Sequence, residues 1–186
     1  TLYQHYEYNQ LGQLTNVYIS TTGNQPSTPE VTYTYTPTGA SDKILYEGGK
    51  QADYGYNIRD WVTSINSIGS PGGSFAAFYE YENNGNISMS RFYNPDIDIS
   101  STHNDYRYSY TYDELNRLTE ADYSFGSSGS SSSWFDVNNL SYDANGNIQS
   151  LRRRNEAGTL IDRLSFDYSD NNQLEVVHDT SGVNLG

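Results

Sequence analysis

The nine residues YTYDELNRL at 110–118 decide the fold, because variants of them recur along the chain of 186 residues. The third residue of this stretch is tyrosine in every copy, and consecutive copies of that tyrosine stand 21 to 31 residues apart. Such a period indicates an array of repeated supersecondary units. The seven copies are YEYNQLGQL at 6–14, YTYTPTGAS at 33–41, YGYNIRDWV at 54–62, YEYENNGNI at 79–87, YTYDELNRL at 110–118, LSYDANGNI at 140–148 and FDYSDNNQL at 166–174.

Each copy has the pattern of a β-hairpin. Aromatic residues two apart, such as Tyr110 and Tyr112, place both rings on one face of a strand. The next four residues predict a type I turn closed by a left-handed residue, the usual three-residue hairpin loop with a bulge. In that register the second tyrosine faces a residue that is apolar in six copies of seven, a favourable cross-strand pair. The pairs are Tyr8 with Leu14, Tyr35 with Ser41, Tyr56 with Val62, Tyr81 with Ile87, Tyr112 with Leu118, Tyr142 with Ile148 and Tyr168 with Leu174.

Two further columns of the repeat support a turn. The first turn position mostly holds side chains that accept a hydrogen bond from the backbone just ahead. The fourth holds only glycine, asparagine or aspartate, which tolerate positive φ at least cost. The first column is Asn9, Thr36, Asn57, Glu82, Asp113, Asp143 and Ser169, and the fourth is Gly12, Gly39, Asp60, Gly85, Asn116, Gly146 and Asn172.

Composition and charge narrow the class of protein. Leu, Ile, Val and Phe number only 35, but the 19 tyrosines can replace them as buried material, since each ring buries roughly 150–250 Å². Ten basic residues against 23 acidic ones give a net charge of −13, which repels phosphate backbones and anionic lipid surfaces. No apolar run approaches the roughly 18 to 20 residues of a membrane-spanning helix. We therefore expect no nucleic-acid partner and no membrane insertion.

The repeat predicts an all-β fold of successive antiparallel β-hairpins in a continuous curved sheet. Almost no helix is expected, because no segment carries apolar residues at helical spacing over three turns. A further hairpin is predicted around residues 156–158. Gly/Ser/Pro-rich insertions at 23–29, 69–74 and 125–135 are predicted to be long hairpin loops, because the repeat resumes in phase after each. Residues 1–186 are thus expected to be a single segment of about seven hairpin repeats.

At this spacing the pattern Y-x-Y-[DN]-x-x-G-[RN]-L resembles the YD repeat of the RHS family. That family includes the shell-forming BC components of bacterial Tc toxin complexes and the YD shell of teneurins. The resemblance covers residues 6 to 177. It implies a β-shell, coiled from hairpins, that encloses a C-terminal and often toxic cargo until delivery.

This sequence departs from the family pattern in a few places. Copy two lacks the acidic turn residue and the following aliphatic, and copies six and seven replace the first tyrosine by Leu140 and Phe166, so local register is expected to be weakest there. Family members that release their cargo do so with a core rich in Asp-Pro and Gly motifs, and no Asp-Pro dipeptide occurs here. We therefore expect a repeat segment of a larger protein, without core, toxin or plug, cut at Thr1 and Gly186.

Two stretches have features of a metal site. DANGN at 143–147 resembles part of a D-x-N-x-[DN]-G calcium loop, but it lacks the later acidic ligand and its sister loops carry Leu, Pro or Arg at ligand positions. NPDIDIS at 94–100 offers Asp96 and Asp98 on one strand face, and a solvated loop is the better interpretation. The absence of cysteine removes thiolate ligands. The sequence predicts no metal and no cofactor.

No catalytic group is predicted either. His5, His103 and His178 show no paired-ligand spacing. The serine cluster 127–133 contains no G-x-S-x-G elbow, so a flexible linker is the better interpretation.

Basic and aromatic residues suggest other binding functions. Arg152, Arg153 and Arg154 form a basic run, and because side chains alternate along a strand, the middle arginine lies on the opposite face from its neighbours. Pairing with acids or blunting of an edge strand is favoured for these arginines over nucleic-acid binding. Tyrosine-rich faces can stack on sugars, with Trp61 and Trp134 as natural platforms, but the aromatics follow the ladder register, which favours packing within the sheet.

The sequence thus predicts a non-enzymatic structural module, part of a YD-repeat β-shell that encapsulates and helps deliver a C-terminal cargo. The expected partners are flanking YD repeats and the cargo of the same polypeptide, together with a secretion machinery, and the expected location is secreted or at the bacterial cell surface. The alternative is an extracellular adhesin that binds glycans through exposed aromatics.

Overall fold

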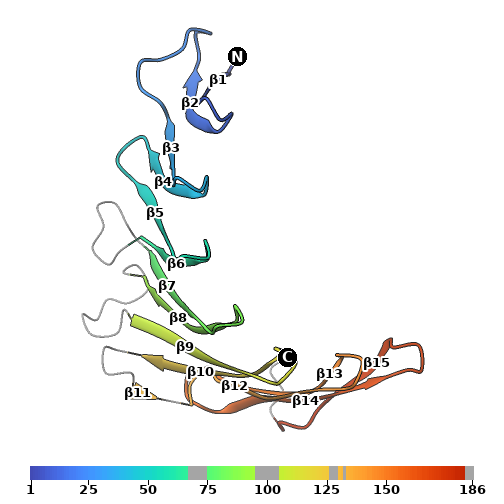
Figure 1. Ribbon diagram of the computed structural model, residues 1–186. Helices are drawn as coiled ribbons and strands as arrows, with labels where there is room; N and C mark the ends of the chain where they lie inside the picture. Colours follow the sequence, from blue (N-terminus) through green and yellow to red (C-terminus); the bar gives the residue numbers. More distant parts are fainter. Residues whose placement is uncertain (67–74, 95–104, 126–129, 132, 183–186) are drawn as a thin grey trace. The chain divides into compact units, whose positions relative to one another are not determined.

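The computed structural model of the chain describes residues 1–66, 75–94, 105–125, 130–131 and 133–182. Two compact units are distinguished, Thr1–Tyr79 with Tyr93–Asp96, and Glu80–Phe92 with Ile97–Gly186. The described residues contain strands, turns and loops and no helix (Figure 1).

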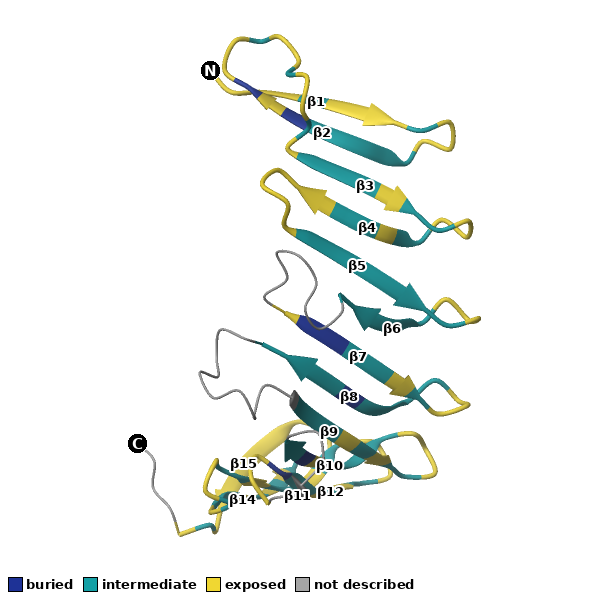
Figure 2. Ribbon diagram, turned by 90° about the vertical axis from the view of Figure 1, so that its left-hand side faces the viewer, coloured by how far each residue is buried: buried dark blue, intermediate teal, exposed yellow. Residues whose placement is uncertain are grey.

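Strands of the first unit follow one another in space in the order of the sequence, from β1 to β7, and neighbouring strands pair antiparallel. Figure 2 shows that the repeat turns of this unit lie along one end of its strands. The strands are β1 (Tyr3–Tyr8), β2 (Leu14–Ser20), β3 (Val31–Tyr35), β4 (Ser41–Tyr46), β5 (Gln51–Tyr56), β6 (Val62–Ile65) and β7 (Ala76–Tyr81).

In the second unit the strands also follow one another in the order of the sequence, except that one short strand lies off this path. The order is β8, β9, β10, β12, β13, β14 and β15, and the short β11 pairs with the far end of β10. These arrangements confirm the predicted all-β class of successive antiparallel hairpins. The strands are β8 (Ile87–Tyr93), β9 (Asp105–Tyr112), β10 (Leu118–Phe125), β11 (Ser130–Ser131), β12 (Val137–Tyr142), β13 (Ile148–Arg154), β14 (Leu160–Tyr168) and β15 (Leu174–Asp179).

All seven repeat turns adopt the predicted geometry. In the fifth, the backbone N–H of Asp113 donates to the carbonyl of Arg117 at 2.9 Å, and the N–H of Asn116 donates to the carbonyl of Asp113 at 3.0 Å. In each of the seven turns the residue at the fourth position has a positive φ, as a type I turn closed by a left-handed residue requires. The φ values are 77° at Gly12, 93° at Gly39, 58° at Asp60, 101° at Gly85, 63° at Asn116, 91° at Gly146 and 64° at Asn172.

The predicted register is also confirmed in the pairings of six repeats. Tyr112 is opposite Leu118, and a bulge follows directly, because two residues on one strand face one on the other. Copy two keeps this pairing, since Tyr35 still faces Ser41. In copy six, where Leu140 replaces the first tyrosine, a further irregularity lies between Asn138 and Ser141. The same pairing holds for Tyr8 with Leu14, Tyr56 with Val62, Tyr142 with Ile148 and Tyr168 with Leu174.

Return turns at the other end of the strands use similar hydrogen bonds. In the predicted hairpin between β13 and β14, Asn155 N–H donates to the carbonyl of Thr159 at 2.9 Å, and Gly158 has a φ of 73°. A second such turn, which we did not predict, joins β4 to β5, where Tyr46 N–H donates to the carbonyl of Lys50 at 2.8 Å.

Of the three insertions, 23–29 joins the paired strands β2 and β3, as expected of a long hairpin loop. The insertion 69–74 lies outside the described residues. In the third, residues 126–129 and 132 also lie outside them, and Ser130–Ser131 form β11.

Few side chains are fully covered, and most strand residues are half-buried (Figure 2). The stability of such a sheet therefore depends on cross-strand pairs and hydrogen bonds more than on a thick core. The three buried polar residues have hydrogen-bond partners, for example Ser90, whose hydroxyl lies 2.8 Å from that of Tyr110. The buried residues are Tyr18, Ala76, Ala77, Ala121 and Tyr123 among the apolar ones, and Ser20, Ser90 and Asp136 among the polar ones.

Candidate functional site: the tyrosine ladder

The second tyrosine of the repeat links its hairpin to the hairpin before it. The hydroxyl of Tyr142 donates to the carbonyl oxygen of Leu118 at 2.7 Å, and Leu118 is the residue that faces the preceding tyrosine, Tyr112. Five tyrosines make this bond to the same position of the preceding repeat. They are Tyr35 to Leu14 (2.7 Å), Tyr56 to Ser41 (2.6 Å), Tyr112 to Ile87 (2.8 Å), Tyr142 to Leu118 (2.7 Å) and Tyr168 to Ile148 (3.0 Å).

These bonds define what we call the tyrosine ladder. Packing alone would accept phenylalanine at this position, as it accepts Leu140 and Phe166 at the first aromatic position. In the five copies with this bond, a hydroxyl that reaches a backbone acceptor explains why the second position is tyrosine and not phenylalanine. Burial is the main cause that raises the pKa of Tyr56 and of Tyr112, which favours the protonated hydroxyl that donates these bonds.

Neighbouring turns are joined by a second row of hydrogen bonds. The side-chain oxygen of Asn116 accepts from the amides of Asn84 at 2.7 Å and Asn86 at 3.1 Å, both in the preceding turn. Asparagine at the left-handed position therefore does more than tolerate positive φ. Comparable links run from Gln13 to the carbonyl of Gly39, from Thr38 to Asp60, from Arg117 to the carbonyl of Asp143, and from Asn145 and Asn147 to Asn172.

The calcium-like loop at 143–147 uses its carboxylate internally. One oxygen of Asp143 accepts the backbone N–H groups of Asn145 and Asn147, both at 2.9 Å, and the other accepts the side chain of Asn147 at 2.8 Å. The Asn147 side chain is the main cause that holds the pKa of Asp143 below its usual range. Among the described residues, no three His, Asp or Glu side chains gather as metal ligands would.

The equivalent acid of copy five is held in the same way. Asp113 accepts the backbone N–H groups of Leu115 and Arg117, both at 2.9 Å, and forms an ion pair with the Arg117 side chain at 2.7 Å. The backbone N–H of Arg117 is the main cause that lowers the pKa of Asp113. The Arg117 guanidinium also lies 4.5 Å from the ring centroid of Tyr142, which positions a cation over that ring.

An aromatic cluster occupies the opposite end of the second unit's strands from these turns. Tyr123 is its centre, and its ring contacts Tyr106, Tyr108 and Phe135 at centroid distances of 6.4, 5.4 and 5.4 Å. Burial is the main cause that raises the pKa of Tyr123 to about 12. A hollow of about 380 Å³ is lined by these four residues and Phe92.

The two tryptophans proposed as sugar platforms both have a covered ring face. Trp134 stacks on Phe125 with a centroid distance of 4.9 Å and an interplanar angle of 2°. The guanidinium of Arg59 lies 5.0 Å from the ring of Trp61. Both contacts agree with the interpretation that these aromatics pack within the protein.

The remaining candidate residues do not meet in a site. His5 Nε2 is buried and has no hydrogen-bond partner among the described residues, and His178 pairs with Asp167 at 2.9 Å. His103, Asp96 and Asp98 lie outside the described residues, as does most of the serine cluster 127–133.

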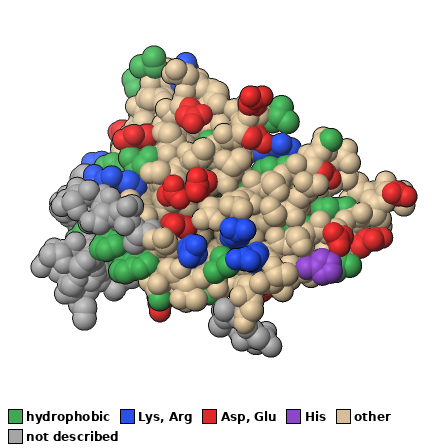
Figure 3. Space-filling view, turned by 90° about the horizontal axis from the view of Figure 1, so that it is seen from below, with side chains coloured by type: hydrophobic (Ala, Val, Ile, Leu, Met, Phe, Trp, Pro, Cys, Tyr) green, Lys and Arg blue, Asp and Glu red, His purple; other side chains and the backbone are tan. Residues whose placement is uncertain are grey.

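The arginine run has mixed partners. As predicted, Arg153 lies on the opposite face from its neighbours, and it pairs with Asp162 at 2.6 Å. Arg154 donates to the carbonyl of Gly158 at 2.7 Å. Arg152 faces Arg163, and no described acid forms an ion pair with it. In Figure 3, basic side chains gather near the middle of the face shown, with acidic ones beside them.

Comparisons with known proteins return structural matches alone. No protein-family model matches the sequence, and no curated protein is similar to it. Among solved structures, the chain is similar to the Photorhabdus luminescens Tc holotoxin pore with a TccC3 mutation (TM-score 0.41, 15% identity, 96% of this chain and 12% of that one). It is also similar to TcdB2-TccC3-Cdc42 (TM-score 0.42, 15% identity, 98% and 13%) and to TcdB2-TccC3 (TM-score 0.42, 13% identity, 97% and 14%).

The chain therefore spans between one tenth and one sixth of the length of the structures it resembles. No helix within the described residues is long and apolar enough to cross a membrane.

Proposed function

We propose that this chain is a non-enzymatic structural module, a segment of a YD-repeat wall that encloses a C-terminal cargo of the same polypeptide. The observation that carries the proposal is the tyrosine ladder. A lone two-stranded hairpin is at best marginally stable in water, so each hairpin needs its neighbours. A hydroxyl that bonds the same backbone position of the hairpin before it supplies such a connection, and it recurs in five repeats.

The polar groups of the turns support a structural role over a catalytic one. Asp113 and Asp143, which could otherwise act as ligands or general acids, have their carboxylate oxygens bonded to their own turns. Flanking repeats would continue the wall at both sides of this segment, and the cargo would lie within it. Export by a secretion machinery, to the cell surface or beyond, belongs to the same proposal.

The test is limited proteolysis of the parent polypeptide, with and without these repeats. The proposal expects the C-terminal cargo to be digested far more slowly when the repeats are present. A cargo that is cut equally fast in both proteins would refute confinement. The isolated cargo, mixed with the repeats as a separate chain, is the matched control, because a wall that encloses in cis leaves it unprotected.

One observation favours a second candidate function, glycan binding. Trp134 is 39% exposed and borders a hollow of about 310 Å³ lined by Tyr106, Tyr123, Phe125, Phe135 and Glu156. A glycan array would then give a signal that Trp134→Ala abolishes and Trp61→Ala retains. This function would be excluded if the unmodified chain bound no glycan, or if both variants still bound glycans.

A further inference from the structure

Strands β13 and β14 bring two arginines together, and no described acid forms an ion pair with either of them. Their register pairs like with like over three positions: Ser150 with Ser165, Leu151 with Leu164, and Arg152 with Arg163. Like charges directly opposite each other on neighbouring strands destabilise a sheet. The next pair shows what a compensated position looks like, because Arg153 faces Asp162 there and forms an ion pair at 2.6 Å.

Neither guanidinium of the like-charged pair has a hydrogen bond or ion pair with a described residue. Asp179, which faces Leu164 from β15, accepts the backbone N–H of Arg163 at 3.1 Å and that of Ser181 at 2.8 Å. The main-chain bond from Ser181 is the first cause that lowers the pKa of Asp179. Asp167, further along β14, pairs with His178 at 2.9 Å. Both carboxylates are thus engaged elsewhere.

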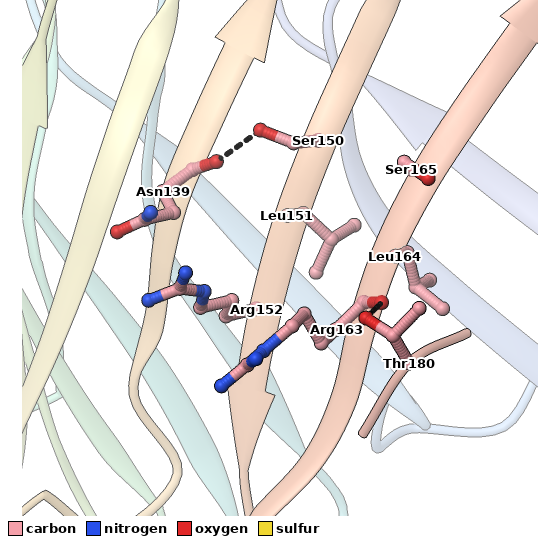
Figure 4. A pocket seen from close by; sticks show the side chains of 8 residues that line it. All are labelled: Asn139, Ser150, Leu151, Arg152, Arg163, Leu164, Ser165 and Thr180. Atoms are coloured by element: carbon pink, nitrogen blue, oxygen red, sulfur yellow. Dashed lines mark hydrogen bonds between the residues drawn. The ribbon is translucent and has the colours of Figure 1, made fainter. Parts of the chain in front are cut away.

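The two arginines border a hollow of about 250 Å³. Figure 4 shows both guanidinium groups extended to the same side, away from Thr180. Ser165 lies two residues from Arg163 and therefore on the same face of β14, and its hydroxyl has no partner among the described residues. Asn139 adds an amide at the rim, while the Ser150 hydroxyl already donates to the Asn139 carbonyl at 2.8 Å.

We infer that this hollow, the Arg152–Arg163 site, binds a dianionic tetrahedral oxyanion of the phosphate or sulfate class. Two adjacent uncompensated cations match two negative charges, and guanidinium groups bind such oxyanions through paired N–H donors. A carboxylate would neutralise only one of them. The net charge of −13 repels a long polyanion, so a small anion or a single ester group is the ligand, and this conclusion does not depend on the proposed shell.

The test is thermal unfolding and calorimetric titration of the chain with inorganic phosphate, phosphoserine, sulfate and acetate at constant ionic strength. Phosphate is expected to bind and to raise the unfolding midpoint, and acetate is not. Comparison of phosphate with phosphoserine separates a free ion from an ester as the source. Arg152→Gln or Arg163→Gln is expected to weaken phosphate binding by about tenfold or more, because each removes a charged hydrogen-bond donor.

Arg153→Gln is the matched control, since that arginine is adjacent in sequence but paired on the other face. It should keep the phosphate response and lower the midpoint of the free chain. The two site variants should instead leave that midpoint unchanged or raise it, because the repulsion is relieved. The inference is overturned if phosphate leaves the unmodified chain unaffected, if acetate acts equally, or if both site variants respond to phosphate as the unmodified chain does.

Discussion

The hydroxyl of Tyr142 and the carbonyl oxygen of Leu118 lie 2.7 Å apart, although the two residues are 24 positions apart in the sequence. Leu118 itself faces Tyr112, whose hydroxyl continues the ladder to the carbonyl of Ile87. Each repeat thus supplies an acceptor at the residue that also packs against its own tyrosine. Because one residue serves both contacts, the register of a hairpin determines where the next hairpin can bond.

Tyr142→Phe is expected to destabilise the chain by about 1–2 kcal/mol, because the ring stays while the Leu118 carbonyl loses its partner in a half-buried position. Tyr8→Phe is the matched control. Tyr8 is 61% exposed and its hydroxyl has no partner among the described residues, so the change should stay within about 0.5 kcal/mol. Urea unfolding followed by circular dichroism measures both. Equal effects of the two variants would show that the hydroxyl bond does not contribute.

Gly146→Ala tests the left-handed turn position. The φ of Gly146 is 91°, and an added Cβ would meet no atom within 4 Å, so the cost is conformational and not steric crowding. A non-glycine residue in left-handed conformation costs about 1–2 kcal/mol. Gly146→Asn should cost less, because Asn116 and Asn172 hold the equivalent position at φ of 63° and 64°. If alanine and asparagine had the same unfolding free energy in denaturant titrations, this explanation of the column would be wrong.

The turns could be predicted because they depend on residues at most six apart. In copy five, Tyr112 ends the strand, Asn116 is the left-handed residue of the turn, and Leu118 is the cross-strand partner of Tyr112. The acceptor of the Tyr142 hydroxyl could not be predicted this way, since it depends on how two hairpins lie side by side. The signal in the sequence was the tyrosine that is never replaced by phenylalanine.

The Arg152–Arg163 site shows a second limit. Alternation along β13 correctly separated Arg153 from Arg152, because side chains of a strand alternate without any knowledge of the neighbouring strand. The partner of Arg152 depends in addition on the register of β14, which the turn at Asn155–Thr159 sets. An acidic partner is the general expectation for a surface arginine in an acidic protein. At this position the register instead brings a second arginine opposite.

Acid should loosen the repeat turns. The pKa values of Asp113 and Asp143 are lowered by hydrogen bonds that exist only in the folded chain, so both favour folding above the ordinary Asp pKa of about 3.9. This contribution is lost as pH falls through the lowered values. Asp143→Asn keeps an oxygen that can accept the same backbone N–H groups, as Asn9 does for Leu11, but cannot titrate. Its unfolding midpoint should therefore fall less steeply below about pH 4 than that of the unmodified chain. Parallel pH profiles would contradict this assignment.

Alkali should act on the aromatic cluster. Burial, followed by the neighbouring Tyr106 and Tyr108, raises the pKa of Tyr123 to about 12, whereas an unfolded tyrosine titrates near about 10. Between these values the folded chain holds a proton that the unfolded chain has released, so stability falls as pH rises through this window and is unaffected below it. Tyr123→Phe keeps the ring contacts and removes the titrating group, and its unfolding midpoint should decline less over the same interval. Absorbance of tyrosinate, followed in both proteins, should show one late-titrating phenol missing from the variant. A variant whose midpoint declines as steeply as that of the unmodified chain would mean that the alkaline transition begins elsewhere.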